Sequence, residues 1–452
     1  MRNERSTPRP QTASSRLSCL CAAILLIALP GREVSRAGQD VPTLLGAVRP
    51  AVQVDRALDA AFERTGVAAA SIAVLGPAGS LYSRTLGRRV GAAATPADDR
   101  TVFRAASLGK AVFAYLVFTL VGSGQLDLDR PLHEYLPRPL TDYPDYADLR
   151  GDLRYRTITA RLALSHRTGF PNWRWQLDDG KLRILFDPGT KFLYSGEGYR
   201  YLQLVVEQIA GRTLEALAQE RVFRPLGMND TSYAWTDEFA TNCAIDRAPI
   251  EKVFGPDFLR RANCAGSLLT TATDYARFLS AILDGKGLPG RLRDEMLRPQ
   301  ASIAGRALFG SPADTGPAAA AGAAPSWCLG WGAFASRAGA ARFHVGYDSP
   351  EYENYAALYL DRKIGLVVLT SGGRGPNSAV PHFVEAAIGN NDTPFAWAGY
   401  GPHPQSPSSA ADQEQPDGLQ GWLRSRDVAS LSAAIDRDPG LVNRTGLRPS
   451  DR

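Results

Sequence analysis

The chain has 452 residues, of which 44% are hydrophobic and 21% are charged, as in an ordinary globular protein. This composition excludes a fibrous or wholly disordered protein, and the length is enough for two or three domains. The formal net charge is +5, but the first 37 residues carry six arginines and two glutamates, so the rest of the chain carries about +1. A nearly neutral chain has no electrostatic basis for binding nucleic acid or anionic lipid.

Residues 1–37 have the layout of a secretory signal peptide. Four arginines precede the apolar run 17–29, and the sequence Ser35-Arg36-Ala37 follows it. The run has thirteen residues, fewer than the roughly 18 expected of a membrane-spanning helix. We therefore expect cleavage after Ala37 and export to the periplasm or the medium, with an uncleaved N-terminal anchor as the alternative.

Three cysteines remain after residue 37, namely Cys243, Cys264 and Cys328. An export compartment permits one disulfide, for which Cys243 and Cys264 are the simplest pair, and buried free thiols are an equal alternative. The cysteines and histidines show none of the spacings typical of a metal site. We expect neither a metal nor a cofactor.

The periodicity of the chain predicts strands near both ends and helices between them. A hairpin is expected from two strands joined at 77–79, and the region of about 125–260 is mostly helical. This order favours an α/β (α+β) fold with one sheet built from both ends of the chain and a helical insertion. The expected helices are 51–65, 108–121, 199–211, one after Thr271 and 379–389; the expected strands are 71–76, 80–87 and a series within 326–373.

Two segments have the composition of loops or linkers. Residues 311–325 are rich in Ala, Gly and Pro, and residues 401–418 are rich in Pro, Ser and Gln. A short amphipathic helix is possible within 419–435. We therefore expect a main domain at 38–400, with a helical subdomain at about 125–260, followed by a linker and tail at 401–452.

Lys110 is a single charge in the apolar helix 108–121. Only six of the 51 basic residues are lysines, and Lys110 alone has a serine, Ser107, three positions before it. Positions i and i+3 share one face of a helix, so a weak nucleophile is paired with a base. Burial can lower the pKa of a lysine, whereas an arginine stays charged. The structural alternative is that Ser107 caps the helix and Lys110 extends its ammonium group to the surface.

Further motifs follow in a fixed order. Tyr194-Ser195-Gly196 stands at the start of a glycine-rich helix, and His344-x-Gly346 lies on a predicted strand. Together with Ser107-x-x-Lys110, this order resembles the serine β-lactamase and penicillin-recognising superfamily, in particular its class C-like branch, which includes esterases and D-amino-acid peptidases. The resemblance covers roughly residues 52–390. It implies a β-lactamase/transpeptidase-like fold, in which an antiparallel sheet is flanked by helices and accompanied by an all-helical subdomain.

The resemblance also implies roles in catalysis. Ser107 resembles the nucleophile that forms an acyl-enzyme. Lys110 resembles the base for its hydroxyl proton, or the cation that lowers the pKa of the family tyrosine. Tyr194 matches that tyrosine, which passes a proton to the leaving group and later activates water.

The third motif of the family lies on an edge strand beside the serine. By this resemblance the backbone N–H groups of Ser107 and Tyr347 form the oxyanion hole, and Gly346 lets the substrate approach the backbone. His344 stands where true β-lactamases often have a lysine.

Two departures from the family pattern bear on the substrate. Gly196 replaces the asparagine that binds an acylamino group, and His344 removes a permanent positive charge that would attract the β-lactam carboxylate. Both favour an esterase or a peptidase-like enzyme over a β-lactamase. Glu197 is expected only to favour the N-terminus of its helix.

The segment 161–175 contains a histidine and two tryptophans. His166 is expected to hydrogen-bond the turn that follows it. Trp173 and Trp175 are either a wall of the substrate cleft or part of the core.

The sequence thus predicts an exported serine hydrolase for a small ester, amide or peptide, possibly a β-lactam, without a nucleic-acid partner or a membrane contact beyond the signal segment. The alternative from another class is a catalytically silent protein of the same fold that binds or senses cell-wall peptides. The presence of Ser107, Lys110 and Tyr194 together favours the enzyme.

Overall fold

The computed structural model describes residues 40–90, 95–254, 258–303, 307–309, 325–348, 352–372, 378–389 and 392–401. The predicted signal peptide at 1–37, the loop at 311–324 and the tail at 402–452 lie outside these ranges. Within them, no helix is both long enough and apolar enough to span a bilayer.

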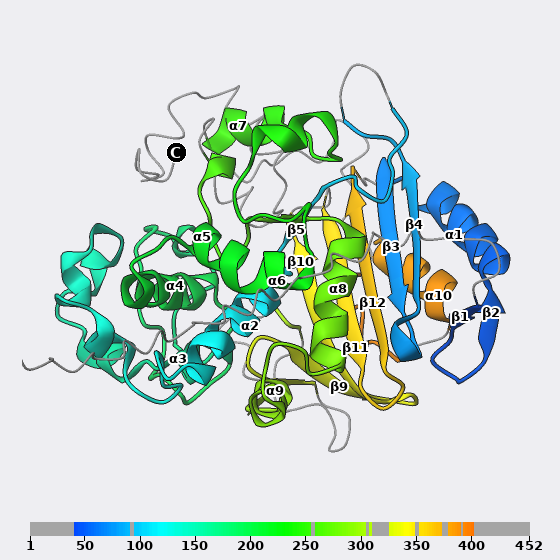
Figure 1. Cartoon of the computed structure of the whole chain (residues 1–452). Coiled ribbons are helices and arrows are strands. Elements are labelled where there is room, and N and C mark those ends of the chain that lie inside the picture. The colour runs from blue at the N-terminus through cyan, green and yellow to red at the C-terminus, as the bar shows by residue number, and fades with distance from the viewer. Residues whose placement is uncertain are drawn as a thin grey trace, which may run out of the picture. The chain divides into compact units, whose positions relative to one another are not determined.

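An eight-stranded antiparallel sheet joins the two ends of the described chain, in the strand order β4-β3-β12-β11-β10-β9-β8-β7 (Figure 1). The N-terminal hairpin β3–β4 pairs with the last strand, β12, as the sequence predicted. The strands are β3 (Ala69–Leu75), β4 (Leu81–Gly87), β7 (Ala301–Ser302), β8 (Ser326–Trp327), β9 (Gly332–Ser336), β10 (Gly339–Tyr347), β11 (Glu353–Tyr359) and β12 (Ile364–Ser371).

Helices cover both faces of this sheet. On β12, Val367 and Leu369 join the same apolar cluster as α8 (Ala272–Leu283), whereas Leu366 and Val368 join the cluster of α1 (Ala51–Thr65) and α10 (Val380–Ile388). Side chains alternate between the faces of a strand, so the continuous apolar run of β12 is buried on both sides. The expected α+β class with a flanked antiparallel sheet is confirmed.

Two short strands, β5 (Phe103–Ala106) and β6 (Leu268–Thr270), pair with each other, and the chain between them consists of helices and turns. The helices here are α2 (Gly109–Gly122), α3 (Ala160–Leu164), α4 (Gly196–Ala210), α5 (Leu214–Ala218), α6 (Arg224–Leu226) and α7 (Arg247–Phe254). Outside this stretch lie α9 (Gly290–Leu297) and the paired strands β1 (Asp40–Pro42) and β2 (Val48–Pro50). The subdomain boundary at about 125–260 stays a prediction.

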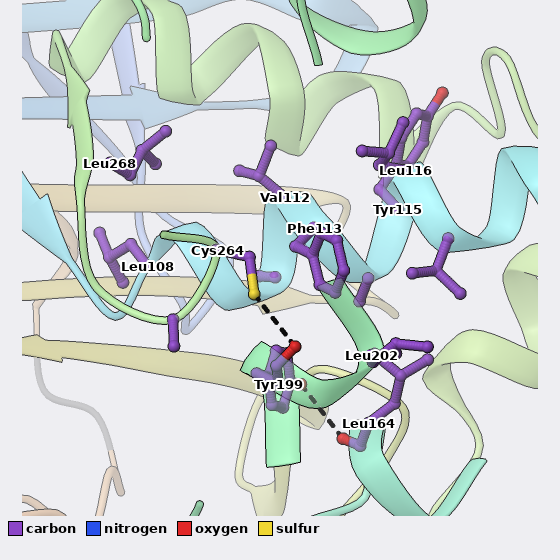
Figure 2. Close-up of a cluster of buried hydrophobic side chains, with 14 of the residues drawn as sticks. Leu108, Val112, Phe113, Tyr115, Leu116, Leu164, Tyr199, Leu202, Cys264 and Leu268 are labelled. Carbon is purple, nitrogen blue, oxygen red and sulfur yellow. Dashed lines mark hydrogen bonds between the residues drawn. The ribbon is translucent and has the colours of Figure 1, made fainter. Parts of the chain in front are cut away.

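The helix α2 is buried around its circumference, because it lies between α8 and the helices of this region. Figure 2 shows Phe113 of α2 near Tyr199 and Leu202 of α4, with Leu268 of β6 in the same cluster. A helix that is apolar all round belongs in a core. The hydroxyl of Tyr199 donates a hydrogen bond to the carbonyl of Leu164 at 3.2 Å, which satisfies that polar group within the cluster (Figure 2).

Of the two alternatives for the cysteines, a disulfide or free thiols, the structure has free thiols. Cys243, Cys264 and Cys328 are all free and buried, so the disulfide between Cys243 and Cys264 is not formed. The thiol of Cys264 instead donates to the carbonyl of Tyr199 at 3.4 Å (Figure 2). Burial raises the pKa of each of these thiols, as expected for inert core cysteines.

The position of β10 corrects one expectation. The resemblance implied an edge strand, but β9, β8 and β7 continue the sheet beyond it. The β9 ladder ends at Phe343, so the segment from His344 to Tyr347 extends past β9. This end of β10 instead lies against β5, the strand that leads to Ser107.

Candidate active site

Ser107 stands at the sharp turn between β5 and α2. The preceding residue, Ala106, has a φ of 49°, in the left-handed region that is costly for a residue with a Cβ. Leu108 is the N-cap of α2 and makes no side-chain capping bond, while the Ser107 hydroxyl donates to the carbonyl of Ala265 at 3.2 Å. Ser107 therefore does not cap the helix, and the structural explanation of the serine fails.

Lys110 lies one turn along α2 and is fully buried. Its Nζ is 3.0 Å from the Ser107 hydroxyl oxygen and donates to the Ala265 carbonyl at 2.5 Å. Burial lowers the pKa of Lys110 to about 7, with the Cys264 thiol acting weakly in the opposite direction. The lysine does not reach the surface, and a large fraction of it is a neutral amine at neutral pH.

Tyr194 precedes α4 and is almost fully buried beside the lysine. The Nζ of Lys110 lies 4.8 Å from the centre of the tyrosine ring. No described residue meets full hydrogen-bond geometry with the tyrosine hydroxyl, although the Ser107 hydroxyl is close enough to act on it. Burial raises the pKa of Tyr194 above its ordinary value, although the Ser107 hydroxyl acts in the opposite direction. The phenol is therefore protonated at neutral pH. The structure brings Ser107, Lys110 and Tyr194 together, and their catalytic roles stay predictions.

The C-terminal end of β10 lies beside Lys110 and Tyr194. His344 is buried, and its Nδ1 pairs with the carbonyl of Val345 at 2.8 Å. Burial, helped by the nearby Lys110, lowers the pKa of His344 to about 3. The imidazole is thus neutral and supplies no positive charge to the site.

Gly346 brings β10 close to the serine strand. A Cβ on this glycine would lie 2.3 Å from the carbonyl oxygen of Ala105, which is closer than any side chain tolerates. A glycine is needed here because two backbones touch. Tyr347 follows at the end of β10 and pairs with Glu353 of β11.

Asn354 on β11 is a site residue that sequence reasoning missed. It is fully buried, and its amide nitrogen donates to the carbonyls of Arg104 at 2.9 Å and Gly346 at 3.2 Å. Its amide oxygen accepts from the backbone N–H of Thr370 at 3.1 Å. One side chain therefore ties the serine strand to the motif strand. The sequence signal is a pair of polar residues, Glu353 and Asn354, at the start of a strand that is otherwise apolar or aromatic.

His166 supports the tyrosine segment rather than only its own turn. Its Nδ1 accepts from the backbone N–H of Ser195 at 3.0 Å, and its ring lies on the Tyr194 ring with 4.2 Å between centroids. The residue has a φ of 57°, so it bends the chain while fully buried. Burial, with a further contribution from Lys110, lowers its pKa well below 6.5, and the imidazole is neutral.

The two tryptophans lie beside the site. Trp173 and Trp175 are partly exposed, and their rings stack with 4.7 Å between centroids. The Nζ of Lys110 lies 5.8 Å from the Trp173 ring centre. Trp173 also packs against the main apolar cluster, so it lies at the edge of the core and near Lys110 at once.

Glu197 does more than favour the N-terminus of α4. It is fully buried and forms an ion pair with Arg174 at 2.8 Å, so it joins the tryptophan segment to the helix that follows Tyr194. Elsewhere among the described residues, no three His, Cys, Asp or Glu side chains gather as metal ligands.

Comparison with known proteins agrees with this geometry. The family model described as Beta-lactamase matches residues 54–389. The chain is 28% identical over 298 residues to the lovastatin esterase of Penicillium rubens, covering 56% of this chain and 74% of that protein. It is 27% identical over 312 residues to the esterase EstB of Burkholderia gladioli, covering 57% and 77%.

A solved structure has the same fold. The octameric penicillin-binding protein homologue from Pyrococcus abyssi superposes with a TM-score of 0.58 and 17% identity, over 75% of this chain and 76% of that chain. The expected β-lactamase/transpeptidase-like fold is confirmed.

Proposed function

The chain belongs to the beta-lactamase family, and from this premise we propose that it is an exported serine hydrolase that cleaves a small ester or amide through an acyl-enzyme on Ser107. One observation carries the proposal. A fully buried lysine with a pKa of about 7 lies 3.0 Å from the hydroxyl of Ser107. A serine hydroxyl is a weak nucleophile until a base removes its proton, and this lysine is deprotonated enough at neutral pH to do so.

Acylation begins with the neutral amine of Lys110. It accepts the proton of Ser107 as the serine oxygen attacks the substrate carbonyl carbon. The backbone N–H groups of Ser107 and Tyr347 are the proposed donors to the oxygen that becomes negative.

The tetrahedral intermediate then loses its leaving group. The protonated phenol of Tyr194 donates its proton to that group and recovers one from the Lys110 ammonium. The lowered pKa of Lys110 and the raised pKa of Tyr194 support this order, because the neutral amine can accept the serine proton and the protonated phenol can then donate one. Water then cleaves the acyl-enzyme by the same path in reverse.

An ester is the favoured substrate class. Gly196 has no amide to bind an acylamino group, and the neutral His344 offers no permanent charge to a β-lactam carboxylate. The two similar proteins described above are named as esterases. Export is supported by the arginine-rich and apolar pattern of residues 1–37.

A fluorophosphonate probe tests the proposal, because it phosphonylates only an activated serine, whose oxygen bonds to phosphorus as fluoride leaves. We expect one covalent adduct on the peptide that contains Ser107 and steady hydrolysis of p-nitrophenyl acetate. Ser107→Ala should lose both, whereas Ser123→Ala, at the exposed end of the same helix, should keep both. Rates on a D-Ala-D-Ala peptide and on nitrocefin should be lower than on the ester. A wild-type protein that takes no label would contradict the enzyme and favour a silent binding protein.

A further inference from the structure

The segment 173–175 presents a flat aromatic surface beside the nucleophile. The rings of Trp173 and Trp175 are within 9° of parallel, and both side chains are partly exposed. Trp173 also approaches Gly266, whose Cβ position would lie 3.9 Å from the ring. The pair therefore lies over the chain that carries Ala265, the residue that hydrogen-bonds both Ser107 and Lys110.

The ring of Trp173 occupies the space next to Gly196 where a side chain would stand. A Cβ added to Gly196 would lie 2.6, 2.7 and 2.8 Å from three ring atoms of Trp173. Real side chains essentially never approach so closely, so an asparagine at 196 and this indole position exclude each other. The space that an asparagine side chain would occupy at position 196 is thus filled by the apolar ring of Trp173.

A buried ion pair holds the tryptophan segment in place. Arg174, between the two tryptophans, donates from Nε and Nη2 to the two carboxylate oxygens of Glu197 at 2.9 and 2.8 Å, and its backbone N–H donates at 3.1 Å. The backbone N–H groups of Gly196 and Glu197 also donate to the carbonyl of Asn172, at 3.0 and 3.1 Å. The hydrogen bonds of Arg174 and Asn172 with Gly196 and Glu197 therefore fix the tryptophan segment against the first turn of α4.

We propose that the Trp173–Trp175 pair binds the acyl part of the substrate and selects esters whose acyl group carries an aromatic ring. This inference rests on the function proposed above. An indole occupies the place of the amide next to Gly196, and the stacked pair is partly exposed. Such a pair favours a flat aromatic group, which can stack on it, over a bulky saturated ring, which cannot. An arylacetyl group has its ring one carbon from the carbonyl, so it can reach the indoles while the carbonyl faces Ser107.

The test compares p-nitrophenyl esters of phenylacetic and cyclohexylacetic acid, which differ in flatness but have the same leaving group. In the wild type we expect kcat/KM to favour the phenylacetyl ester by about tenfold. Trp175→Ala should reduce this ratio towards one, and Trp175→Phe should restore most of it. Tyr135→Ala, which removes a partly exposed ring that contacts Arg130, is the matched control and should leave the ratio unchanged.

A second variant avoids removal of a ring. Gly196→Ala adds one methyl group that displaces the Trp173 indole, and it should reduce the ratio as Trp175→Ala does. The inference is overturned if the wild type has no preference, if neither variant changes the ratio, or if the variants instead alter discrimination among alcohol groups in a series of acetate esters. The proposed function is judged separately, by whether the wild type acquires a label on Ser107.

Discussion

If Lys110 is the base proposed above, its pKa sets the pH at which the protein becomes active. If the neutral amine removes the serine proton, the acylation rate follows the deprotonated fraction of a group with a pKa of about 7. That fraction is about one-eleventh at pH 6 and about ten-elevenths at pH 8, so the rate should rise about tenfold between them. His344, with a pKa of about 3, and His166, with a pKa well below 6.5, are already neutral in this range and do not contribute.

The assay is the second-order rate of fluorophosphonate labelling, or the acylation burst with p-nitrophenyl acetate, from pH 5.5 to 9. Lys110→Arg should abolish the burst, because arginine keeps its charge and cannot accept a proton. Lys286→Arg, an exposed position, should retain the full pH profile. A labelling rate that does not change between pH 6 and 8 would refute the reasoning.

The same titration should appear in the stability of the protein. The pKa of Lys110 falls from 10.5 in the unfolded chain to about 7 in the folded one, so between these values the unfolded chain binds the additional proton. The free energy of unfolding should therefore increase with pH through this window, by about 1.4 kcal/mol per pH unit. Between pH 7 and 9, urea unfolding of the wild type should gain about 2–3 kcal/mol over Lys110→Met. Equal slopes for the two proteins would contradict the buried neutral lysine.

Three further predictions concern neighbouring groups. Tyr194→Phe should lower kcat about a hundredfold or more on an ethyl ester, whose leaving group needs a proton, and less on a p-nitrophenyl ester; equal losses on both would argue against a proton donor. Glu197→Gln should cost about 3–5 kcal/mol in urea unfolding, because the mostly buried Arg174 loses its charged partner, whereas Glu134→Gln in an exposed pair should cost less than about 1 kcal/mol. Asn354→Asp should reduce kcat while KM stays near the wild-type value, since it removes the donor that ties two strands at the site; an unchanged kcat in a folded protein would contradict this positioning role.

The parts of the fold that follow local rules could be predicted from the sequence. The helix at Ala51–Thr65 matched at both ends, because its apolar period is clear and Gly66 ends it with a φ of 67°. The helix expected at 199–211 instead begins at Gly196, since glycines obscured its start and Ser195 caps it through the N–H of Gly198. Local pattern carries this information, and small errors arise at the ends of elements, as for the strand expected at 71–76, which is Ala69–Leu75.

Relations between distant segments could not be predicted in the same way. The order of strands beyond β10 depends on which strands pair with each other. The sequence predicts where strands lie along the chain but not which strands are neighbours in the sheet. Asn354 contacts the carbonyl of Arg104 across 250 residues of sequence, and Arg174 finds Glu197 only after folding. The motifs of Ser107, Lys110 and Tyr194 could be recognised because their order along the chain is itself a signal. The hydrogen bonds of Asn354 and Arg174 that support these residues have no comparable pattern in the sequence.

Burial acts on both of the proposed proton-transfer groups of the site. Burial disfavours whichever form is charged, so it lowers the pKa of the Lys110 amine and raises that of the Tyr194 phenol. Both groups are then neutral in the same pH range, and neither is an unpaired buried charge, which would be far more costly. The proposed base, Lys110, and the proposed acid, Tyr194, therefore need no neighbouring carboxylate to set their protonation. Water that entered around Lys110 would return both pKa values towards normal and remove the base and the activity together.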